Sequence, residues 1–476
     1  MGKNRSFPPA RSPVRVLTLA VIDMSVTPEI LSYPDKGHQQ WSRLESVRAL
    51  FCSKYGREPD IFVRVPGRVN LIGEHVDYCG YSVCPMAVEQ NIVFAAAITP
   101  EGSPFLKLVN DQAKVYPDTT VPDRKFEIDL KRDGWAAYVL CGVKGIAEIL
   151  VGKSLVNMEI AVSGTVPPGS GLSSSSALVC ASLLTTAQLN NVKLTKFAMA
   201  EMSASCERFI GMEGGGMDQA IAFLATRGCA KHIQFNPVRT EDVKLPSNAV
   251  FVIGHSLVTK RKAETSEYNT RVAECRLASQ IIAKESGIDW EQIKKVKDLQ
   301  DALSCNLEEL LNLVDKHLHA GVYTKQEVCQ CLGIGENELN EISLSPSTRK
   351  IKEFVLKERV THVVTEASRV NSWLMETSIE GLGVLMTASH NSMAKDYDAS
   401  DPACDRLVNS FMTAGALGAR VTGAGWGGCV VALTTPDRLN QLMDHVRLDF
   451  YAGYEGDVGK VLFQSEPQSG ACVIKA

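Results

Sequence analysis

The chain has 476 residues, of which 45% are hydrophobic and 22% are charged, so its composition is that of a globular protein. Its 50 basic and 54 acidic residues give a formal net charge of −4, which argues against a protein that binds nucleic acid through a basic surface. The length is too great for one core of ordinary size and predicts two domains.

The cysteines and the apolar runs predict a cytoplasmic protein. Fourteen cysteines are far fewer than a disulfide scaffold would contain, and none lies in a CxxC pair. No run of eighteen apolar residues occurs, so we expect no membrane-spanning segment. We therefore expect reduced thiols, mostly in the cores, and a monomer that binds neither nucleic acid nor a membrane.

Residues 1–40 are expected to be a disordered leader. Residues 1–6 fit the loose pattern of N-myristoylation, and a Pro/Arg/Ser stretch follows them. A single acyl chain gives only marginal membrane binding and few basic residues follow, so an unmodified leader is the preferred interpretation. The apolar run at residues 14–22 is short for a signal peptide, and no clear cleavage site follows it.

From Trp41 onward, the spacing of apolar residues predicts mixed helices and strands. Helices are predicted over residues 44–55, 135–150, 177–189 and 196–210, and residues 260–345 are predicted to be mainly helical. Strands are predicted over residues 61–65, ended by Pro66-Gly67, and over residues 83–98, 105–109, 158–162, 250–255 and 430–433.

A change of composition at residues 237–246 is taken as the domain boundary. It divides the chain into an N-terminal domain of residues 41–240 and a C-terminal domain of residues 241–476. The C-terminal domain is expected to carry a helical insertion at about residues 280–345.

Residues 167–177, Pro-Pro-Gly-Ser-Gly-Leu-Ser-Ser-Ser-Ser-Ala, have the features of a phosphate-binding loop. They follow a predicted strand and open a predicted buried helix. The glycines let the backbone approach an anion, while serine hydroxyls and the first-turn N–H groups can donate hydrogen bonds to it. An elaborate helix N-cap is the alternative, although one Ser would serve that purpose. No Lys lies in this loop, so any cation must come from elsewhere.

A second glycine-rich loop lies at residues 423–428, where Gly-Ala-Gly-Trp-Gly-Gly fits the GxGxxG pattern. A dinucleotide site needs a helix after this pattern, but the next residues predict a strand. By itself the loop is at least as well explained as a tight strand–loop–strand turn that needs glycine at positive φ. A P-loop is excluded, because its nearest match at residues 152–154 lacks the upstream glycine.

Residues 66–78 are dense in functional groups, with Arg68, Glu74, His75 and Asp77 close together. Carboxylates and an imidazole offer hydrogen bonds to several hydroxyls at once, which is typical of a sugar or polyol site. A polar surface turn is the alternative, but the apolar residues between the polar ones argue against a solvated turn.

These motifs resemble those of a known kinase family. Residues 64–77 resemble the galactokinase signature, and the serine-rich loop and residues 418–430 resemble the second and third motifs of the GHMP small-molecule kinases. The motifs occur in the family's order, and the resemblance runs from about residue 44 to the C-terminus. It implies an α/β (α+β) fold of two GHMP-kinase domains with the active site at their interface. Three stretches most resemble the family members that act on N-acetylgalactosamine: residues 78–82, 211–219 and 245–253.

The resemblance implies an ATP-dependent kinase with Mg²⁺ that phosphorylates the C1 hydroxyl of N-acetylgalactosamine and, more weakly, of galactose. We expect small residues at Gly80 and at positions 214–216 to leave space for the acetamido group. Galactokinase proper is the alternative of the same class. A catalytically weak sensor that binds galactose and ATP and acts through a protein partner is the alternative of a different class, although such proteins can lack serine-loop residues that are present here.

The resemblance also assigns roles to matching residues. Asp218 matches the catalytic base, and Arg68 matches an arginine that holds this base ionised, lines the sugar and stabilises the transferring phosphoryl group. The other matches are the sugar-site residues Glu74, His75, Asp77, Gly215 and Tyr268, the phosphate-loop residues Gly171, Ser173, Ser174 and Ser175, the Mg²⁺ ligands Ser175 and Glu207, and the nucleotide-side residues Trp135 and Lys262. Arg261 stands where the closer relatives have Asn.

Overall fold

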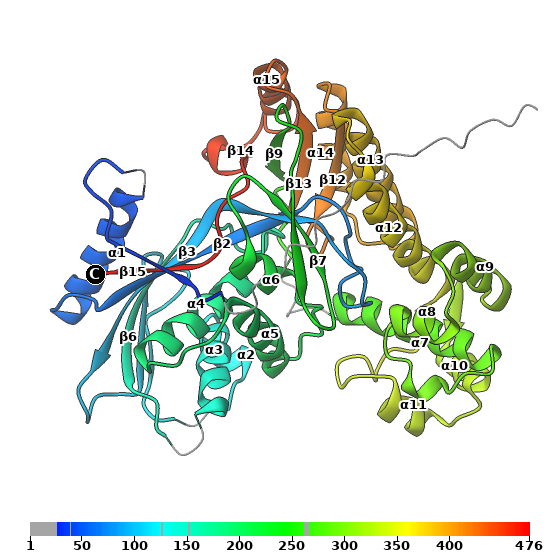
Figure 1. Cartoon of the computed structure of the whole chain (residues 1–476), viewed down its shortest axis with the longest axis horizontal. Helices are drawn as coiled ribbons and strands as arrows, with labels where there is room; N and C mark the ends of the chain where they lie inside the picture. Colours follow the sequence, from blue (N-terminus) through cyan, green and yellow to red (C-terminus); the bar gives the residue numbers. More distant parts are fainter. Residues whose placement is uncertain (1–25, 39, 125–126, 151–152, 261–265) are drawn as a thin grey trace, which may run out of the picture.

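The N-terminal part of the chain is built on a seven-stranded sheet (Figure 1). The computed structural model describes residues 26–476 except 39, 125–126, 151–152 and 261–265. The strand order is β1 (Glu29–Leu31), β15 (Cys472–Lys475), β2 (Ile61–Asn70), β3 (Pro85–Thr99), β6 (Asn157–Gly164), β4 (Leu106–Asn110) and β5 (Thr119–Val121). The β1–β15 and β4–β6 pairs are parallel, and the other pairs are antiparallel.

Helices cover both faces of this sheet. On one face lie α2 (Leu130–Asp133), α3 (Ala136–Ile149), α4 (Ser174–Leu189), α5 (Lys196–Cys206), a 3₁₀ turn (Glu207–Ile210) and α6 (Met217–Leu224). Helix α1 (Trp41–Tyr55) covers the other face, where Phe51, Phe62 and Val93 belong to one buried apolar cluster. Successive residues of β2 point to opposite faces, so Phe62 lies in the α1 core and Val63 in the core around α4.

A second, four-stranded sheet forms part of the C-terminal half. Its order is β12 (Gly418–Thr422), β13 (Cys429–Thr434), β9 (Val250–His255) and β14 (Leu462–Ser465), all antiparallel. Helices α13 (Ile379–Lys395) and α14 (Pro402–Thr413) pack on it, and α15 (Leu439–Asp449) packs on α14. A hairpin of β7 (Ala230–Gln234) and β8 (Arg239–Val243) precedes β9.

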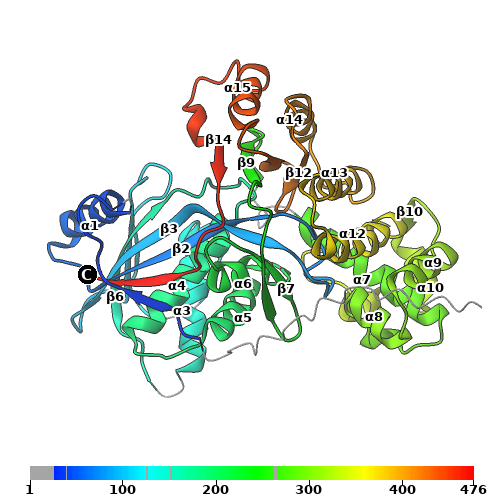
Figure 2. The same ribbon diagram turned by 45° about the horizontal axis from the view of Figure 1, so that its top comes forward.

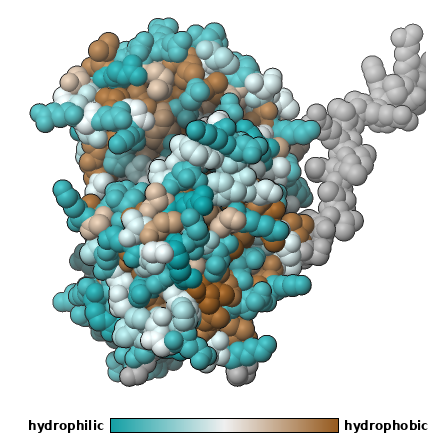
Figure 3. All heavy atoms as spheres, turned by 90° about the vertical axis from the view of Figure 1, so that its left-hand side faces the viewer, coloured by the Kyte–Doolittle hydropathy of each residue, from teal (hydrophilic) through white to brown (hydrophobic). Residues whose placement is uncertain are grey.

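A mainly helical region extends to one side of this sheet (Figure 2). It contains α7 (Glu267–Glu285), a 3₁₀ turn (Trp290–Gln292), α8 (Val296–Leu303), α9 (Leu307–His317), β10 (Val322–Thr324), α10 (Lys325–Leu332), α11 (Glu336–Ile342), β11 (Glu353–Val355) and α12 (Lys357–Met375). Helix α12 packs on both α7 and α13 and so joins this region to the second sheet. Hydrophilic side chains cover most of the face shown in Figure 3.

The predicted elements from residue 44 to residue 255 are present, but β2 runs further than expected. It continues past Pro66 to Asn70, with an irregularity between Pro66 and Arg68. The pairing of β2 with β3 is interrupted here, and the Arg68 N–H donates instead to the carbonyl of Leu172 at 3.2 Å. Strand β2 is therefore hydrogen-bonded to the serine-rich loop at this point. The Pro-Gly pair therefore marks a break in the pairing of β2 with β3, where Gly67 lies opposite three residues of β3, and not the end of β2.

The two ends of the described chain meet in the first sheet. Cys472 of β15 pairs with Arg64 of β2, and Glu29 of β1 pairs with Cys472. A boundary near residue 240 therefore leaves the last strand with the N-terminal sheet, and residues 29–31 form a strand where a disordered leader was expected. The possible acylation site at residues 1–6 lies outside the described residues.

Two further expectations concern thiols and membranes. All fourteen cysteines lie among the described residues, where they form no disulfide, and nine of them are buried. Within the described part of the chain, the helices are too short or too polar to cross a membrane.

Candidate active site

The polar cluster, the start of α6 and the loop between β12 and β13 surround a narrow cavity of about 20 Å³. This cavity adjoins a cleft of about 1300 Å³, and the two share Glu207, Met212 and Ala424 in their walls. The small cavity is lined by the predicted sugar-site residues Arg68, Glu74, His75, Asp77, Gly215, Asp218 and Tyr268. The large cleft is lined by the predicted phosphate-loop residues Gly171, Ser173, Ser174 and Ser175. The fold thus brings the two predicted groups of residues to one connected space.

Arg68 and Asp218 form a buried ion pair in the small cavity. Arg68 Nε donates to Asp218 Oδ1 at 2.8 Å, and Arg68 Nη2 lies 2.6 Å from the same oxygen. Ser176 Oγ donates to Asp218 Oδ2 at 3.3 Å. Arg68 is 1% exposed, so it acts on the carboxylate with little screening by water and favours its ionised form. An ionised carboxylate in a substrate cavity can accept a proton from a hydroxyl.

Arg68 also connects this carboxylate to the serine-rich loop. Its Nη1 donates to the carbonyl oxygen of Gly171, two residues before Ser173. The guanidinium therefore lies between the carboxylate and the loop, where charge on a transferring phosphoryl group would develop.

Glu74 is held by partners from β12 and the loop that follows it. Its Oε2 accepts from Arg420 Nη2 at 3.2 Å and from the Gly423 N–H at 3.1 Å. Burial raises the pKa of Glu74, and the charges of Arg420 and Arg68 oppose that rise. The side chain also lines the cavity, so it is positioned to accept hydrogen bonds from a polar ligand.

Asp77 lies against the start of α6. Its Oδ2 accepts from the Met217 N–H at 3.2 Å. Gly215 approaches so closely that a Cβ there would overlap Asp77 and the Tyr78 N–H. Only glycine therefore permits this contact, which explains Gly215 within the glycine run that precedes Asp218.

The ring of His75 has protein partners at both nitrogens. Its Nε2 donates to the carbonyl of Ala424 at 3.0 Å, so Nδ1 accepts from the Tyr78 hydroxyl at 2.8 Å. The ring of Tyr268, from the first turn of α7, lies 5.6 Å from that of His75. These contacts favour a role for the His75 ring in shaping the cavity, whereas the resemblance implied a direct sugar ligand.

The serine-rich loop presents an open helix start to the large cleft. Helix α4 begins at Ser174, and Ser173 before it has a φ of 61° and makes no capping hydrogen bond. The Ser173 Oγ is buried and has no hydrogen-bond partner among the described residues. The N-cap alternative is therefore not what the structure shows, and the helix start and its hydroxyls fit the phosphates of a nucleotide.

The loop at residues 423–428 joins β12 to β13, as the turn interpretation expected, and its glycines have positive φ values. It also packs on the serine-rich loop. The Cys429 N–H donates to the Ser170 carbonyl at 2.8 Å, and a Cβ on Gly171 would lie 2.6 Å from the Thr422 carbonyl. The third motif therefore supports the second by close contact between their backbones.

The remaining predicted residues fall into three groups. Ser175 and Glu207 line the large cleft, and Glu207 is buried at the end of α5. Within the described ranges, no three His, Cys, Asp or Glu side chains cluster as a ready-made metal site. Trp135 lines the same cleft, and its Nε1 donates to the Pro117 carbonyl at 3.0 Å. Arg261 and Lys262 lie outside the described residues.

The two candidates for the acetamido space differ in position. Gly214, Gly215 and Gly216 line the small cavity. Gly80 does not, because it packs against Lys297, whose Cβ would lie 2.8 Å from a Cβ at this glycine. The expectation that Gly80 leaves space beside the sugar is therefore not supported.

A buried polar group lies behind the polar cluster, and the sequence motifs did not predict it. Glu366 Oε1 accepts from the Gly73 and Glu74 N–H groups at 2.8 and 3.1 Å, and His362 Nε2 donates to the Glu74 carbonyl at 3.1 Å. Both come from α12 and, like Arg420, are 0% exposed. The position of Arg420 inside the third motif, residues 418–430, was the one signal that pointed to any of them.

Three family models match successive parts of this chain, and all three describe galactokinases or GHMP kinases. A model described as the galactokinase galactose-binding signature matches residues 49–98. Models for the GHMP kinase N-terminal and C-terminal domains match residues 137–226 and 373–452.

Curated relatives and solved structures are also galactokinases or other GHMP kinases. A galactokinase of Dictyostelium discoideum is 36% identical, over 91% of this chain and 94% of its own. One of Candida parapsilosis is 32% identical, with the same coverage. The crystal structure of Lactococcus lactis galactokinase with galactose has a TM-score of 0.71 at 23% identity, covering 90% of this chain and 99% of its own. A mevalonate kinase has a TM-score of 0.55 at 18% identity, covering 86% and 99%.

Proposed function

This chain belongs to the galactokinase family of GHMP kinases, and from that membership we propose that it phosphorylates the C1 hydroxyl of a galactose-type sugar with Mg²⁺ and ATP. The family makes it a sugar kinase, a phosphotransferase with a hydroxyl acceptor. The observation that carries the proposal is the buried pair of Arg68 and Asp218, which lies between a polar cavity and a cleft with an uncapped helix start.

The chemistry follows from this arrangement. The Asp218 carboxylate takes the proton of the C1 hydroxyl, the sugar oxygen bonds to the γ-phosphorus, and the bond to the leaving ADP breaks. Arg68 stabilises the negative charge that develops on the phosphoryl oxygens. The backbone N–H groups at the start of α4 and the hydroxyl of Ser173 hold the phosphates.

A divalent ion would be held by Ser175 and Glu207, which line the same cleft. Two protein oxygens, with nucleotide phosphates and water, suit an ion that keeps much of its hydration. When bound, Mg²⁺ neutralises charge on the β- and γ-phosphates. In a Glu207→Gln variant we expect the Mg²⁺ concentration for half-maximal rate to rise, because the ion loses a charged ligand.

For the sugar, we propose that N-acetylgalactosamine is preferred and that galactose is the weaker substrate. Support comes from Gly214, which lines the small cavity and has no heavy atom within 4 Å of the position of a Cβ. That space suits an acetamido substituent, which a larger side chain at residue 214 would exclude.

The test compares steady-state phosphorylation of N-acetylgalactosamine, galactose and N-acetylglucosamine with Mg²⁺ and ATP. A Gly214→Leu variant should lower kcat/KM for N-acetylgalactosamine more than for galactose. A wild-type preference for galactose would retain the kinase and reject the proposed specificity. Saturable binding of sugar and ATP without sugar-dependent turnover would instead support the sensor.

A further inference from the structure

The loop between β12 and β13 contacts both substrate regions. On the sugar side, the Gly423 N–H donates to Glu74 at 3.1 Å and the Ala424 carbonyl accepts from His75 at 3.0 Å. On the nucleotide side, the Cys429 N–H donates to the Ser170 carbonyl at 2.8 Å. A shift of this loop would therefore disturb Glu74 and His75 of the small cavity together with the serine-rich loop.

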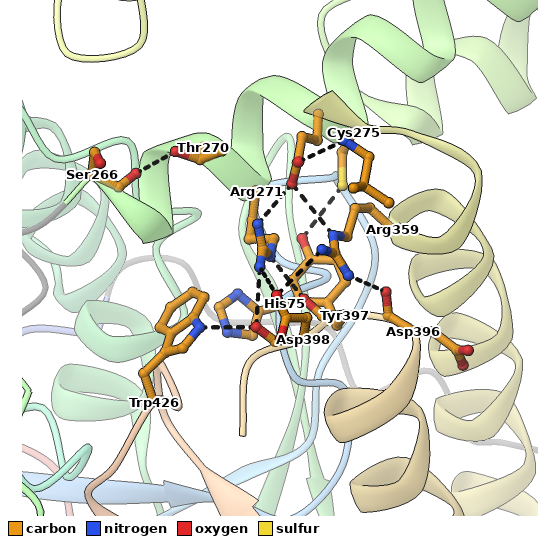
Figure 4. A network of polar contacts seen from close by, with 12 residues as sticks. His75, Ser266, Thr270, Arg271, Cys275, Arg359, Asp396, Tyr397, Asp398 and Trp426 are labelled. Carbon is orange, nitrogen blue, oxygen red and sulfur yellow. Dashed lines mark hydrogen bonds and ion pairs between the residues drawn. The ribbon is translucent and has the colours of Figure 1, made fainter. Parts of the chain in front are cut away.

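The turn at residues 397–399 lies beside this loop, with Asp398 next to Trp426 (Figure 4). The backbone N–H of Trp426 donates to the Ala399 carbonyl at 3.0 Å, and its indole Nε1 donates to the Asp398 carbonyl at 2.9 Å. A Cβ on Gly425 would overlap the Ala399 carbonyl, so the two backbones are in close contact. The position of the turn thus determines the position of the loop.

Arg271 of α7 holds this turn. Its Nε donates to the Tyr397 carbonyl at 2.8 Å, and its Nη2 donates to the carbonyl and the carboxylate of Asp398, both at 3.0 Å. The guanidinium also lies 5.6 Å from the ring of Trp426, and the residue is 7% exposed. The remaining partner is Glu274, whose Oε2 accepts from Nη1 at 2.9 Å. Arg271 therefore contacts both the turn and the aromatic ring of the loop, while Arg359 of α12 contacts the turn and the residue before it, at the Asp396 carbonyl (2.5 Å) and Asp398 Oδ2 (3.4 Å).

The same turn reaches the sugar side by a second route. The Tyr397 hydroxyl lies 2.5 Å from that of Tyr78, which donates to His75. Tyr268, three residues before Arg271 on α7, lines the sugar cavity. The positions of these groups therefore depend on one another.

We propose that Arg271 is a positioning residue that holds the loop at residues 423–428 in one conformation for both substrates, so that sugar and nucleotide bind with positive coupling. While Arg271 holds it, the loop moves as one rigid piece, so the loop position that one ligand stabilises is already set for the other ligand. The inference rests on the proposed function, because it takes sugar and ATP as the two ligands.

The experiment measures sugar affinity of the full chain by calorimetry, with and without Mg²⁺ and a non-hydrolysable ATP analogue. N-acetylgalactosamine and galactose are both used. In the wild type we expect the analogue to tighten sugar binding by about fivefold or more, the lower end of typical coupling. In Arg271→Met the effect should fall below about twofold, and Arg271→Lys should restore part of it.

Two further variants keep the test decisive. Trp426→Phe retains an aromatic ring and removes the N–H to Asp398, so it should reduce the coupling without removing a buried charge. If Arg271→Met does not fold, the Trp426→Phe variant alone tests the proposal. Lys325→Met is the matched control, since Lys325 is another buried cation of the helical region, bonded to Glu336 and to the Arg349 carbonyl. The control should retain wild-type coupling.

The outcomes separate this inference from the proposed function. Sugar binding by the wild type that the analogue does not change would overturn the coupling alone. Wild-type coupling in both Arg271→Met and Trp426→Phe would overturn the role of Arg271. A wild type that binds neither sugar would overturn the proposed function and the coupling with it.

Discussion

Gly171 of the serine-rich loop and Gly423 of the loop after β12 are in backbone contact. A Cβ on Gly423 would overlap the carbonyl of Gly171, and Gly423 has a φ of 87°. Arg68 donates to that same carbonyl. This contact therefore joins the nucleotide side of the site to the residues around the sugar cavity.

The first prediction concerns Gly423→Ala. The added methyl group would push the loop away from Gly171. If this shift weakens nucleotide binding by about 1.4 kcal/mol or more, the KM for ATP rises about tenfold or more. Gly415→Ala is the matched control, since Gly415 has a φ of 91° but no heavy atom within 4 Å of a Cβ position. Both variants should lose about 1–2 kcal/mol of stability from backbone strain, but only Gly423→Ala should affect ATP. Equal ATP KM values in the two variants would contradict the contact.

The second prediction concerns Asp218→Asn. The amide cannot accept the substrate proton, so we expect kcat to fall by about 10²- to 10⁴-fold. Sugar KM should change by less than about threefold, because the amide oxygen still accepts from Arg68. Ser176→Ala, which removes only the 3.3 Å hydrogen bond to Oδ2, should lower kcat by less than about tenfold. A kcat near that of the wild type in Asp218→Asn would exclude it as the base.

The third prediction separates binding from stability in α4. Ser173 Oγ has no hydrogen-bond partner among the described residues, so Ser173→Ala should leave the unfolding free energy within about 0.5 kcal/mol. It should raise ATP KM by about tenfold, because it removes a donor to a charged phosphate.

Ser182 provides the reverse control on the same helix. Its hydroxyl is buried and donates to the Val139 carbonyl at 2.5 Å, away from the cleft. Ser182→Ala should lower the unfolding free energy by about 1 kcal/mol and leave ATP KM unchanged. Urea unfolding and initial-rate kinetics measure both quantities. Equal changes of ATP KM and of unfolding free energy in the two variants would contradict the assignment of Ser173 to phosphate binding.

The local pattern of apolar residues was sufficient to predict the helices and strands that surround the site. The apolar residues of β9 and α4 predicted a buried strand and a buried helix, and the structure has them at residues 250–255 and 174–189. The serine-rich loop and the polar cluster could also be chosen from the sequence, because their groups lie close together along the chain.

The residues that local pattern did not find act across large sequence distances. Arg420 reaches Glu74 from β12, and Glu366 reaches the Gly73 N–H from α12. Within their own helix or strand, nothing distinguishes these charges from exposed ones until the tertiary structure buries them. Strand β15 pairs with β2 through only four residues, which is too short to carry a periodic signal.

The fourth prediction is that stability falls as pH decreases from about 6.5 to about 4, and it follows from buried His362. Burial lowers the pKa of His362 from 6.5 to about 4. Below pH 6.5 the unfolded chain takes up a proton that the folded chain does not, so stability is full above this window and declines through it. Burial also lowers the pKa values of His232, His255 and His390, which adds to the slope in the same direction.

Glu366 contributes to the pH dependence of stability mostly below this window. Burial would raise its pKa, but the charges of Arg369, Arg420 and His362 and a hydrogen bond from Ser389 together lower it to about 2. Its stabilising effect is therefore present above its ordinary pKa of 4.5 and is lost as pH falls towards 2.

His362→Gln, which can keep a donor to the Glu74 carbonyl, should reduce the slope of unfolding free energy by up to about 1.4 kcal/mol per pH unit, the value for one proton. His319→Gln is the control, because this exposed histidine has a raised pKa, chiefly from its hydrogen bond with the Ala320 carbonyl. Urea unfolding across the window measures the slopes, and a wild-type slope in His362→Gln would show that another group carries the dependence.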